Sequence, residues 1–262
     1  MCHLLVMNCN TPTDIVFSFE GFAKRGGLTD HHSDGWGVAF FEDRACRLLI
    51  DSQPSVSSPV ADLVRSYPIK SLNVIAHIRK ATQGVVALEN CHPFMRELWG
   101  RHWVFAHNGN LENFAAPDEG VFQPVGVTDS EAAFCVLLHG LRCAFPEATA
   151  KNPPSVAQIT SALNPLVAQI ATHGTFNFCL SNGQAMWAHC STDLYYIVRE
   201  HPFTTAHLKD ADVTIDFEQH TTPEDRVAVI ATQPLTDNET WHKMAQYEFL
   251  VFKDGKPCAC RV

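Results

Sequence analysis

Short apolar segments of this chain come in groups, and amphipathic segments lie between the groups. Continuous or alternating apolar residues over such lengths predict strands, whereas apolar residues three and four positions apart predict helices. Because strands and helices do not alternate one by one, we expect an α+β layered architecture rather than a repeating βαβ parallel sheet. The strands are expected at 2–8, 35–41, 47–51, 72–79, 103–108, 176–181, 185–190, 194–199, 213–217, 227–232 and 249–253.

Helical spacing occurs at 15–22, 133–144 and 159–170. Pro165 lies inside the last of these segments and predicts a bend or an interruption there. The segment 152–154, Asn-Pro-Pro, is the best candidate for a linker, but neither of its flanks looks complete by itself.

The composition limits the possible partners and the location. With 46% hydrophobic residues the chain can bury a large core, and we expect residues 2–262 to form a single domain. The net charge is -9 and no cluster of Lys and Arg is present, which argues against nucleic acid as a partner. No apolar run approaches the ~20 residues that cross a bilayer. No secretory signal is recognisable, so we expect no membrane partner and a cytoplasmic protein.

Neither the cysteines nor the histidines form a recognised metal motif. The ten cysteines are expected to stay reduced, because the chain is long and shows no export signal. Cys258 and Cys260 are one residue apart, whereas a zinc site normally shows a wider gap and a second pair. The fourteen histidines are scattered, without a His-Glu-x-x-His pattern. We therefore expect neither a metal nor another cofactor.

Cys2 follows the initiator methionine and opens an apolar, strand-like run. Removal of Met1 would give Cys2 a free α-amine, whose ordinary pKa of about 7.7–8.0 suits a general base near neutral pH. A nucleophile can be activated by such an amine without a histidine partner. The alternative interpretation is a small buried residue in the first strand.

Glycines are dense at 25–27, Arg-Gly-Gly, and at 34–37, Asp-Gly-Trp-Gly. This density is explained equally well by tight turns before a strand and by a functional loop. A phosphate-binding loop is excluded, because the spacing G-x-G-x-x-G is absent.

Arg79 ends the predicted strand 72–79. Alternation places its side chain on the face opposite to that of Val74 and Ala76. An arginine at that place offers a planar fork suited to a carboxylate. Taken alone, a solvated surface arginine is the alternative.

The segment 106–113 carries Asn108 and Gly109 at the end of a strand pattern. The pair Asn-Gly predicts a hairpin turn. In a functional interpretation, the Asn108 amide and the Gly109 N–H point at one spot and form an oxyanion hole.

Asp129 stands in Thr128-Asp129-Ser130-Glu131, before the helix pattern 133–144. Thr128 and Glu131 have the spacing of a capping box. Asp129 by itself is therefore also explained as an acid that complements the helix dipole.

Taken together and in this order, these segments resemble the class II glutamine amidotransferases, a branch of the N-terminal-nucleophile (Ntn) hydrolases. The segment 90–94, Asn-Cys-His-Pro-Phe, resembles the Asn-x-His-Pro loop of that family. The motifs cover roughly residues 2–145, and the chain looks most like the stand-alone bacterial members. The resemblance implies the Ntn-hydrolase four-layer α/β/β/α sandwich.

The resemblance also implies catalytic roles. Cys2 would attack the γ-amide carbon of glutamine and form a γ-glutamyl thioester, while its α-amine takes the thiol proton and passes it to departing ammonia. Asn108 and Gly109 would hold the oxyanion. Arg25 would orient the N-terminal residue.

Three further residues would bind the substrate in this family. Arg79 would pair with the α-carboxylate of the substrate, with Thr82 nearby, and Asp129 would pair with its α-ammonium group. A zwitterionic amino-acid head needs one fixed cation and one fixed anion, and both are present.

The chain departs from the better-known synthase members at Lys80 and Gln83, where they often carry an aromatic residue and a histidine. The aromatic residue helps to gate an ammonia tunnel in those enzymes, and we expect no second domain here to receive ammonia. We therefore expect a glutaminase of the amidotransferase type, with an ammonia-accepting protein as a possible partner. Two alternatives stay open: hydrolysis of another γ-glutamyl amide, such as a glutathione-like peptide, and a non-catalytic amino-acid sensor or interaction subunit.

Overall fold

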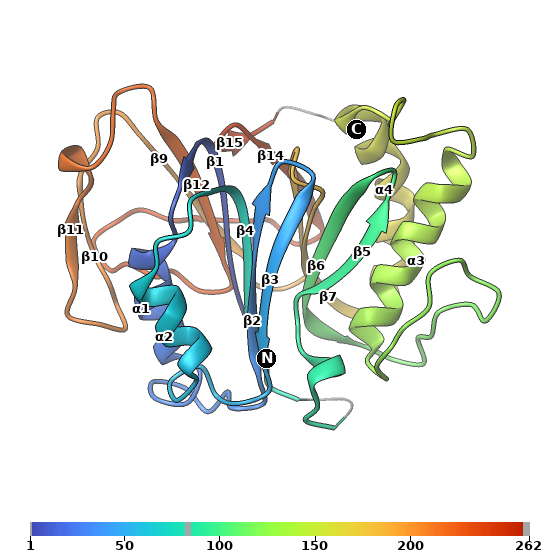
Figure 1. Ribbon diagram of the computed structural model, residues 1–262, viewed down its shortest axis with the longest axis horizontal. Helices are drawn as coiled ribbons and strands as arrows, with labels where there is room; N and C mark the ends of the chain where they lie inside the picture. Colours follow the sequence, from blue (N-terminus) through green and yellow to red (C-terminus); the bar gives the residue numbers. More distant parts are fainter. Residues whose placement is uncertain (1, 82–84, 259–262) are drawn as a thin grey trace.

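The computed structural model describes residues 2–81 and 85–258. Two large antiparallel sheets lie face to face, and helices cover the outer face of each sheet (Figure 1). These are the four layers, α/β/β/α, that the resemblance implies. The prediction of an α+β fold is confirmed.

The first sheet has seven strands and contains the N-terminal strand near its centre. In order across the sheet, its strands are β13 (His242–Lys243), β9 (Tyr195–Glu200), β12 (Arg226–Ala231), β1 (His3–Thr13), β4 (Ser71–Ile78), β2 (Trp36–Glu42) and β3 (Ala45–Asp51).

The second sheet has six strands, and a separate two-stranded ribbon completes the β-structure. Across this sheet lie β15 (Lys256–Pro257), β14 (Glu248–Lys253), β8 (Met186–Cys190), β7 (Gly174–Ser181), β6 (Arg101–Leu111) and β5 (Phe94–Leu98), and the ribbon pairs β10 (Thr205–His207) with β11 (Thr214–Asp216).

Helices α1 (Val16–Lys24) and α2 (Pro59–Ser66) cover the seven-stranded sheet, and α3 (Asp129–Ala144) and α4 (Val156–Ala171) cover the six-stranded sheet (Figure 1). Among the described residues, no helix is long and apolar enough to cross a membrane. Two short 3₁₀ helices occupy Leu88–Asn90 and Phe217–Gln219.

Strand β1 is buried on both faces, because it lies between two apolar layers. Leu5 packs in the cluster that contains Phe19 of α1. Leu4 and Val6 belong to the cluster between the sheets. Side chains alternate between the faces of a strand, so a run of consecutive apolar residues is what a central, doubly covered strand needs.

One edge of the seven-stranded sheet brings several chain segments together. The first residue of β1, His3, pairs with the last residue of β4, Ile78. Ile78 also pairs with Trp36, the first residue of β2. The residues just before β1, just after β4 and just before β2 are therefore neighbours, although they are far apart in the sequence.

The two sheets are also joined by a polar contact near this edge. His77 Nε2 of β4 lies 3.1 Å from the backbone oxygen of His107 in β6. This contact brings the residue that follows His107, Asn108, toward the edge where β1 begins.

Two local predictions were wrong. Asn108 and Gly109 do not form a hairpin turn, because β6 continues through them to Leu111 and pairs with β7 along this stretch. The interruption predicted at Pro165 does not occur, because α4 continues through this residue, which lies on its exposed side; the bend there stays a prediction. The packing of Leu163 and Val167 against the sheet outweighs the local cost of proline.

Replacement of Pro165 by alanine should stabilise the protein. Proline inside a helix removes a backbone hydrogen bond and clashes with the preceding turn. We expect Pro165→Ala to raise the free energy of unfolding by roughly 1–3 kcal/mol in urea denaturation, the unfolded-state entropy of proline offsetting part of the gain. The control Gln169→Ala, on the same exposed side of α4, should stay within about 0.5 kcal/mol. A loss of stability in Pro165→Ala would contradict this assignment.

Candidate active site

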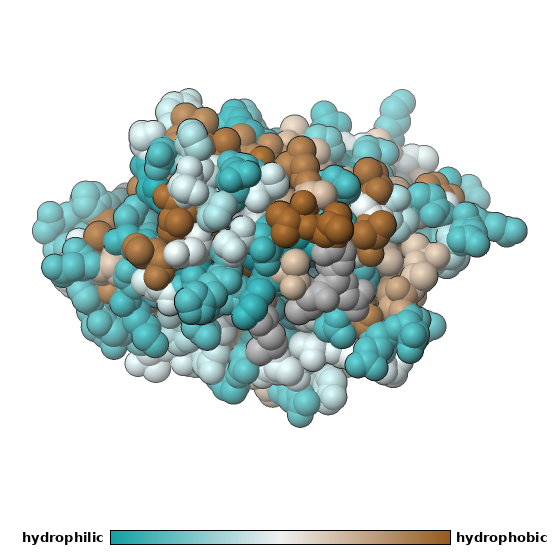
Figure 2. Space-filling view, turned by 90° about the horizontal axis from the view of Figure 1, so that it is seen from below, coloured by the Kyte–Doolittle hydropathy of each residue, from teal (hydrophilic) through white to brown (hydrophobic). Residues whose placement is uncertain are grey.

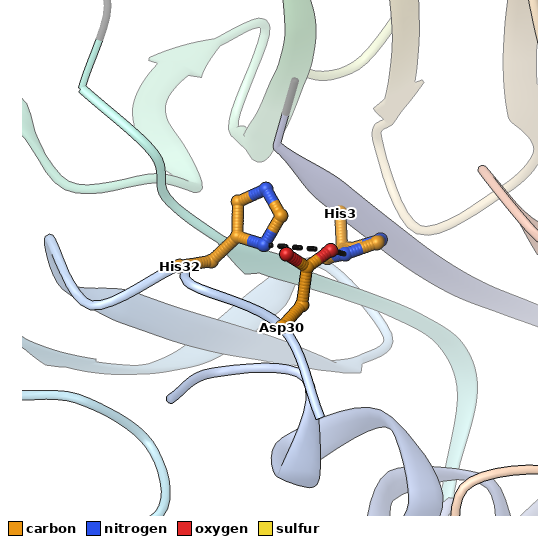
Figure 3. Close-up of side chains that lie close together, drawn as sticks. All are labelled: His3, Asp30 and His32. Atoms are coloured by element: carbon orange, nitrogen blue, oxygen red, sulfur yellow. Dashed lines mark hydrogen bonds and ion pairs between the residues drawn. The ribbon is translucent and has the colours of Figure 1, made fainter. Parts of the chain in front are cut away.

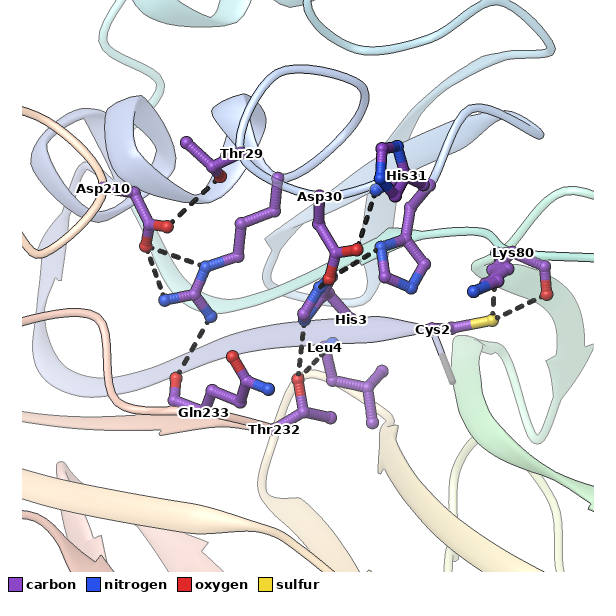
Figure 4. Close-up of polar contacts among 12 residues, drawn as sticks. Cys2, His3, Leu4, Thr29, Asp30, His31, Lys80, Asp210, Thr232 and Gln233 are labelled. Carbon is purple, nitrogen blue, oxygen red and sulfur yellow. Dashed lines mark hydrogen bonds and ion pairs between the residues drawn. The ribbon is translucent and has the colours of Figure 1, made fainter.

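A pocket of about 360 Å³ opens where β1 begins. Segments from both sheets and from the loop before β2 form its wall. Figure 4 shows Cys2 beside Lys80, with His3 next along β1. The residues that line the pocket are mostly polar or charged: Cys2, His3, Asp30, His32, Lys80, Asn108, Asp193, Tyr195, Thr232 and Gln233.

Cys2 is half-buried and its sulfur contacts the backbone after β4. The Lys80 N–H donates to Cys2 Sγ at 3.2 Å, and Cys2 Sγ lies 3.4 Å from Lys80 O. Burial raises the pKa of the Cys2 thiol, although the Lys80 backbone and the charge of Arg79 act to lower it. The thiol is therefore protonated near neutral pH and needs a base before it can act as a nucleophile.

Arg79 is buried, with only 2% of its surface exposed, so the alternative of a solvated surface arginine is wrong. Its backbone N–H donates to Gly35 O at 2.8 Å, which continues the sheet by one residue. Its Nη1 donates to Val85 O at 3.2 Å. A buried guanidinium with its fork held in place is suited to bind a carboxylate.

Gly109 has no room for a side chain. A Cβ atom at this residue would lie 1.9 Å from Thr175 O and 2.4 Å from His107 Nε2. Glycine here allows β6 to approach β7 closely. The preceding residue, Asn108, is buried, and Asn108 Oδ1 has no hydrogen-bond partner among the described residues.

Asn108 is supported from behind by the neighbouring strand β7. Asn177 Nδ2 donates to Asn108 O at 3.0 Å and to Thr192 Oγ1 at 2.9 Å. Asn177 Oδ1 accepts from the N–H groups of Ser191 and Thr192 at 2.8 and 3.0 Å. These bonds fix the backbone at Asn108, so the side-chain amide enters the pocket from a rigid strand.

Asp129 is the first residue of α3 and is buried. Asp129 Oδ2 accepts from the Leu111 N–H at 2.7 Å. Its negative charge acts on the Cys2 thiol and raises the pKa, in opposition to Arg79. Asp129 therefore does more than complement the helix dipole: it places a buried anion near Cys2.

The capping box predicted at the start of α3 forms only in part. Thr128 Oγ1 accepts from the Glu131 N–H at 3.3 Å, as in a capping box. Among the described residues, however, the Glu131 side chain does not accept a hydrogen bond from the Thr128 N–H. It forms an ion pair with Arg96 at 2.5 Å and accepts from the Gly126 N–H at 2.7 Å.

The glycines of Asp34-Gly35-Trp36-Gly37 allow the loop at 90–93 to pack against β2. Gly35 has a φ of +101°, and a Cβ there would lie 2.5 Å from Cys91 Sγ. A Cβ at Gly37 would lie 2.5 Å from His92 O. Asp34 Oδ2 accepts from the Ala81 N–H at 2.8 Å and thereby fixes the backbone just after Lys80.

Arg25 is buried and donates hydrogen bonds to residues of two later segments of the chain. Its Nε and Nη2 donate to Asp210 Oδ2 at 2.8 and 2.6 Å, and Nη2 also donates to Pro234 O at 2.9 Å. These contacts position the loop that follows α1. Thr82, the remaining predicted site residue, lies outside the described residues.

Among the pocket residues that have no place in the sequence motifs, His3, Asp30 and His32 lie together. His3 Nε2 lies 3.0 Å from Asp30 Oδ2, and His32 Nδ1 lies 3.1 Å from the same oxygen. Burial lowers the pKa of His3 to about 4, despite its hydrogen bond with Asp30. The only signal in the sequence is the adjacency of His3 to Cys2, because 27 residues separate His3 from Asp30.

Comparison with known proteins gives a consistent result. Residues 1–262 match the model of the family described as "Glutamine amidotransferases class-II". A protein of Haemophilus influenzae named "Putative glutamine amidotransferase" is 55% identical over 259 residues, which are 99% of this chain and 86% of the relative. "Putative glutamine amidotransferase YafJ" of Escherichia coli is 52% identical and is covered to 99%, with 98% of this chain aligned.

Solved structures share the fold. The crystal structure of a "predicted glutamine amidotransferase from Pseudomonas aeruginosa PA01" is similar with a TM-score of 0.78 and 45% identity, over 98% of this chain and 100% of that chain. The glutamine phosphoribosylpyrophosphate amidotransferase from B. subtilis has a TM-score of 0.60 and 13% identity, with 98% of this chain and 48% of that chain covered. The second likeness shows the fold alone.

The buried histidine His92 should make the protein sensitive to acid. Burial lowers the pKa of His92 well below its ordinary value of 6.5. As the pH falls below 6.5, the unfolded chain binds a proton there and the folded chain does not, so stability is lost. We expect His92→Phe to reduce the slope of unfolding free energy against pH by up to about 1.4 kcal/mol per unit below pH 6.5.

The slope is measured by urea denaturation between pH 4.5 and 7.5. Rings of His77 and Phe94 lie 4.1 and 4.4 Å from that of His92, so phenylalanine suits the site. His92→Gln also removes the titration and should flatten the slope in the same way, whatever it does to stability at pH 7. An unchanged slope in both variants would show that His92 does not stay neutral in the folded protein.

Proposed function

Because this chain belongs to the class II glutamine amidotransferases, we propose that it cleaves the γ-amide of glutamine to glutamate and ammonia through a thioester on Cys2. The observation that supports this proposal most is the surroundings of Cys2. A buried cation, Arg79, and a buried anion, Asp129, both act on its thiol, and Asn108 lines the same pocket.

The reaction needs a base, since burial raises the pKa of the Cys2 thiol. We propose that Met1 is removed and that the α-amine of Cys2 takes the thiol proton. The sulfur then attacks the carbonyl carbon of the γ-amide of glutamine. The proton held by the amine passes to the departing ammonia, and water hydrolyses the resulting γ-glutamyl thioester to glutamate and the free thiol.

The oxyanion of each tetrahedral intermediate would be held by Asn108 and Gly109. One feature supports the assignment of Asn108: it enters the pocket from a strand whose backbone Asn177 fixes, and Gly109 is the next residue of this strand. Donors that are fixed before the reaction stabilise the transition state without reorganisation, and the loss of one typically costs ~2.7–4 kcal/mol.

The amino-acid head of the substrate would be held by Arg79 and Asp129. Arg79 offers its guanidinium to the α-carboxylate, and Asp129 offers its carboxylate to the α-ammonium group. Thr82 would assist Arg79. Arg25 would act indirectly, because its contacts with Asp210 and Pro234 position the loop at one side of the pocket.

The acceptor of ammonia is proposed to be a separate protein. Apolar side chains are exposed shortly after Lys80, at Val85, Val86 and Leu88. Figure 2 shows hydrophobic residues gathered near the middle of one face of the molecule. A partner that covers such a surface would exclude water from the site and receive the ammonia.

Hydrolysis of a glutathione-like γ-glutamyl peptide is the second candidate. Arg79 and Asp129 would recognise only the γ-glutamyl head. The pocket that holds Cys2 is also lined by two residues with charged side chains, Lys80 and Asp193. Such groups suit a leaving group larger and more polar than ammonia.

Kinetics of variants should separate recognition from chemistry. We expect Arg79→Ala and Asp129→Ala to raise KM strongly, because removal of one member of a buried charge pair costs ~2–5 kcal/mol. Arg79→Lys keeps the charge but loses the fork, and should recover only part of the affinity. Asn108→Ala should instead lower kcat by roughly 10²- to 10³-fold, since the oxyanion exists only near the transition state.

The same assays compare glutamine with glutathione, with Cys2→Ser as the inactive control. Faster turnover of glutamine supports the glutaminase, whereas faster turnover of glutathione would replace it with the γ-glutamyl peptide hydrolase. Equal effects of all three alanine variants on kcat, with unchanged KM, would defeat the assignment of roles. Turnover of neither substrate by the wild type would favour a non-catalytic sensor.

A further inference from the structure

His3, Asp30 and His32 gather three metal-binding atoms in one wall of the pocket (Figure 3). One nitrogen from each imidazole and one carboxylate oxygen all lie within 4.8 Å of one another. In Figure 3 both rings point toward the carboxylate of Asp30, which lies between them. Two imidazoles and a carboxylate are a common ligand set for a catalytic or regulatory Zn²⁺ ion, with the fourth position left open.

We propose that His3, Asp30 and His32 bind a Zn²⁺ ion. Zinc bonds of about 2.0–2.1 Å in a tetrahedron place the ligand atoms about 3.3 Å apart. The separations of 3.0 Å from His3 Nε2 and 3.1 Å from His32 Nδ1 to Asp30 Oδ2 are close to this value. The two imidazole nitrogens lie within 4.8 Å of each other and would have to approach one another around the ion.

Neighbouring groups hold the proposed ligands in place by hydrogen bonds, as is usual for residues that coordinate a metal. Thr232 Oγ1 lies 3.4 Å from His3 Nδ1, the nitrogen that faces away from Asp30. The free oxygen of the carboxylate, Asp30 Oδ1, accepts from the His31 N–H at 2.7 Å. The outer atom of each of these two ligands thus has a partner, and the inner atoms, His3 Nε2 and Asp30 Oδ2, contact each other and would turn to the ion when it binds.

The loop that carries Asp30 and His32 is itself fixed. Arg25 binds Asp210 Oδ2, and Thr29 Oγ1 donates to Asp210 Oδ1 at 3.2 Å, so one carboxylate fixes both ends of the segment before Asp30 (Figure 4). His31 also forms a β-bridge with Gly26. The ligands therefore need no large rearrangement to receive an ion.

The pocket gives the ion access to solvent and leaves room for its fourth ligand. Asp30 is half-exposed, whereas both imidazoles are buried. Cys2 lines the same pocket, so a bound Zn²⁺ ion adds positive charge beside the proposed nucleophile. The expectation of no metal rests on motifs of closely spaced ligands. Such motifs do not describe ligands that a strand and a distant loop bring together.

Zinc binding is tested without any assay of activity, so its result is independent of the proposed glutaminase. The full chain carrying Cys2→Ser, which removes the thiol nearest to the site, is treated with a chelator and titrated with Zn²⁺ by calorimetry. We expect one zinc site per chain. Its affinity for Zn²⁺ should fall by roughly 10- to 100-fold or more in His32→Gln and in His3→Gln. His31→Gln is the matched control, because its exposed ring lies next to the ligands in sequence but outside the cluster, and it should bind as the parent does.

Thermal unfolding provides the second measurement. Saturating Zn²⁺ should raise the Tm of the parent and of His31→Gln, but not that of His32→Gln, because only a folded site gains the binding energy. Circular dichroism confirms that each variant is folded. Equal zinc affinity in the parent and both ligand variants, or no binding to the parent, would overturn the proposal. Asp30 would then only hydrogen-bond the two imidazoles.

Discussion

The site depends on the position of β1 at the centre of the seven-stranded sheet. β12 pairs with one side of this strand and β4 with the other. Both faces are covered by apolar layers, so a slip of one residue would exchange the buried sets on both faces. The register is thereby fixed, and the residue before His3 can lie only at the edge where β4 ends. Cys2 precedes β1 and belongs to no strand or helix itself, but the fixed register of β1 holds it beside Lys80.

The second constraint is the cost of buried charge. Arg79 and Asp129 are both removed from water, and each is held by backbone groups, Val85 O and the Leu111 N–H respectively. A buried ion is expensive unless a partner compensates it. A zwitterionic substrate would place its carboxylate beside Arg79 and its ammonium group beside Asp129, so that each buried charge gains an opposite charge.

The family resemblance implied the four layers, and its motifs pointed to Asn108, which lines the pocket of Cys2, and to Arg79 and Asp129, whose charges act on the thiol. Patterning was sufficient for the long strands and for α3, whose apolar residues repeat clearly. It failed where tertiary contacts outweigh local preference: Asn108 and Gly109 continue a strand, and Pro165 stays within a helix. The cluster of His3, Asp30 and His32 could not be predicted, because only the register of β1 and the loop held by Asp210 bring these side chains together.

In the proposed mechanism, the residue after Met1 becomes a covalent nucleophile. The most direct test is intact-mass spectrometry of the protein mixed with glutamine and quenched in acid within its first turnovers. We expect a chain that begins at Cys2 and carries one γ-glutamyl group. Peptide mapping should place this group on Cys2, and it should be absent from Cys2→Ser. A fully active chain that retains Met1, or a γ-glutamyl group attached to any other residue, would contradict it.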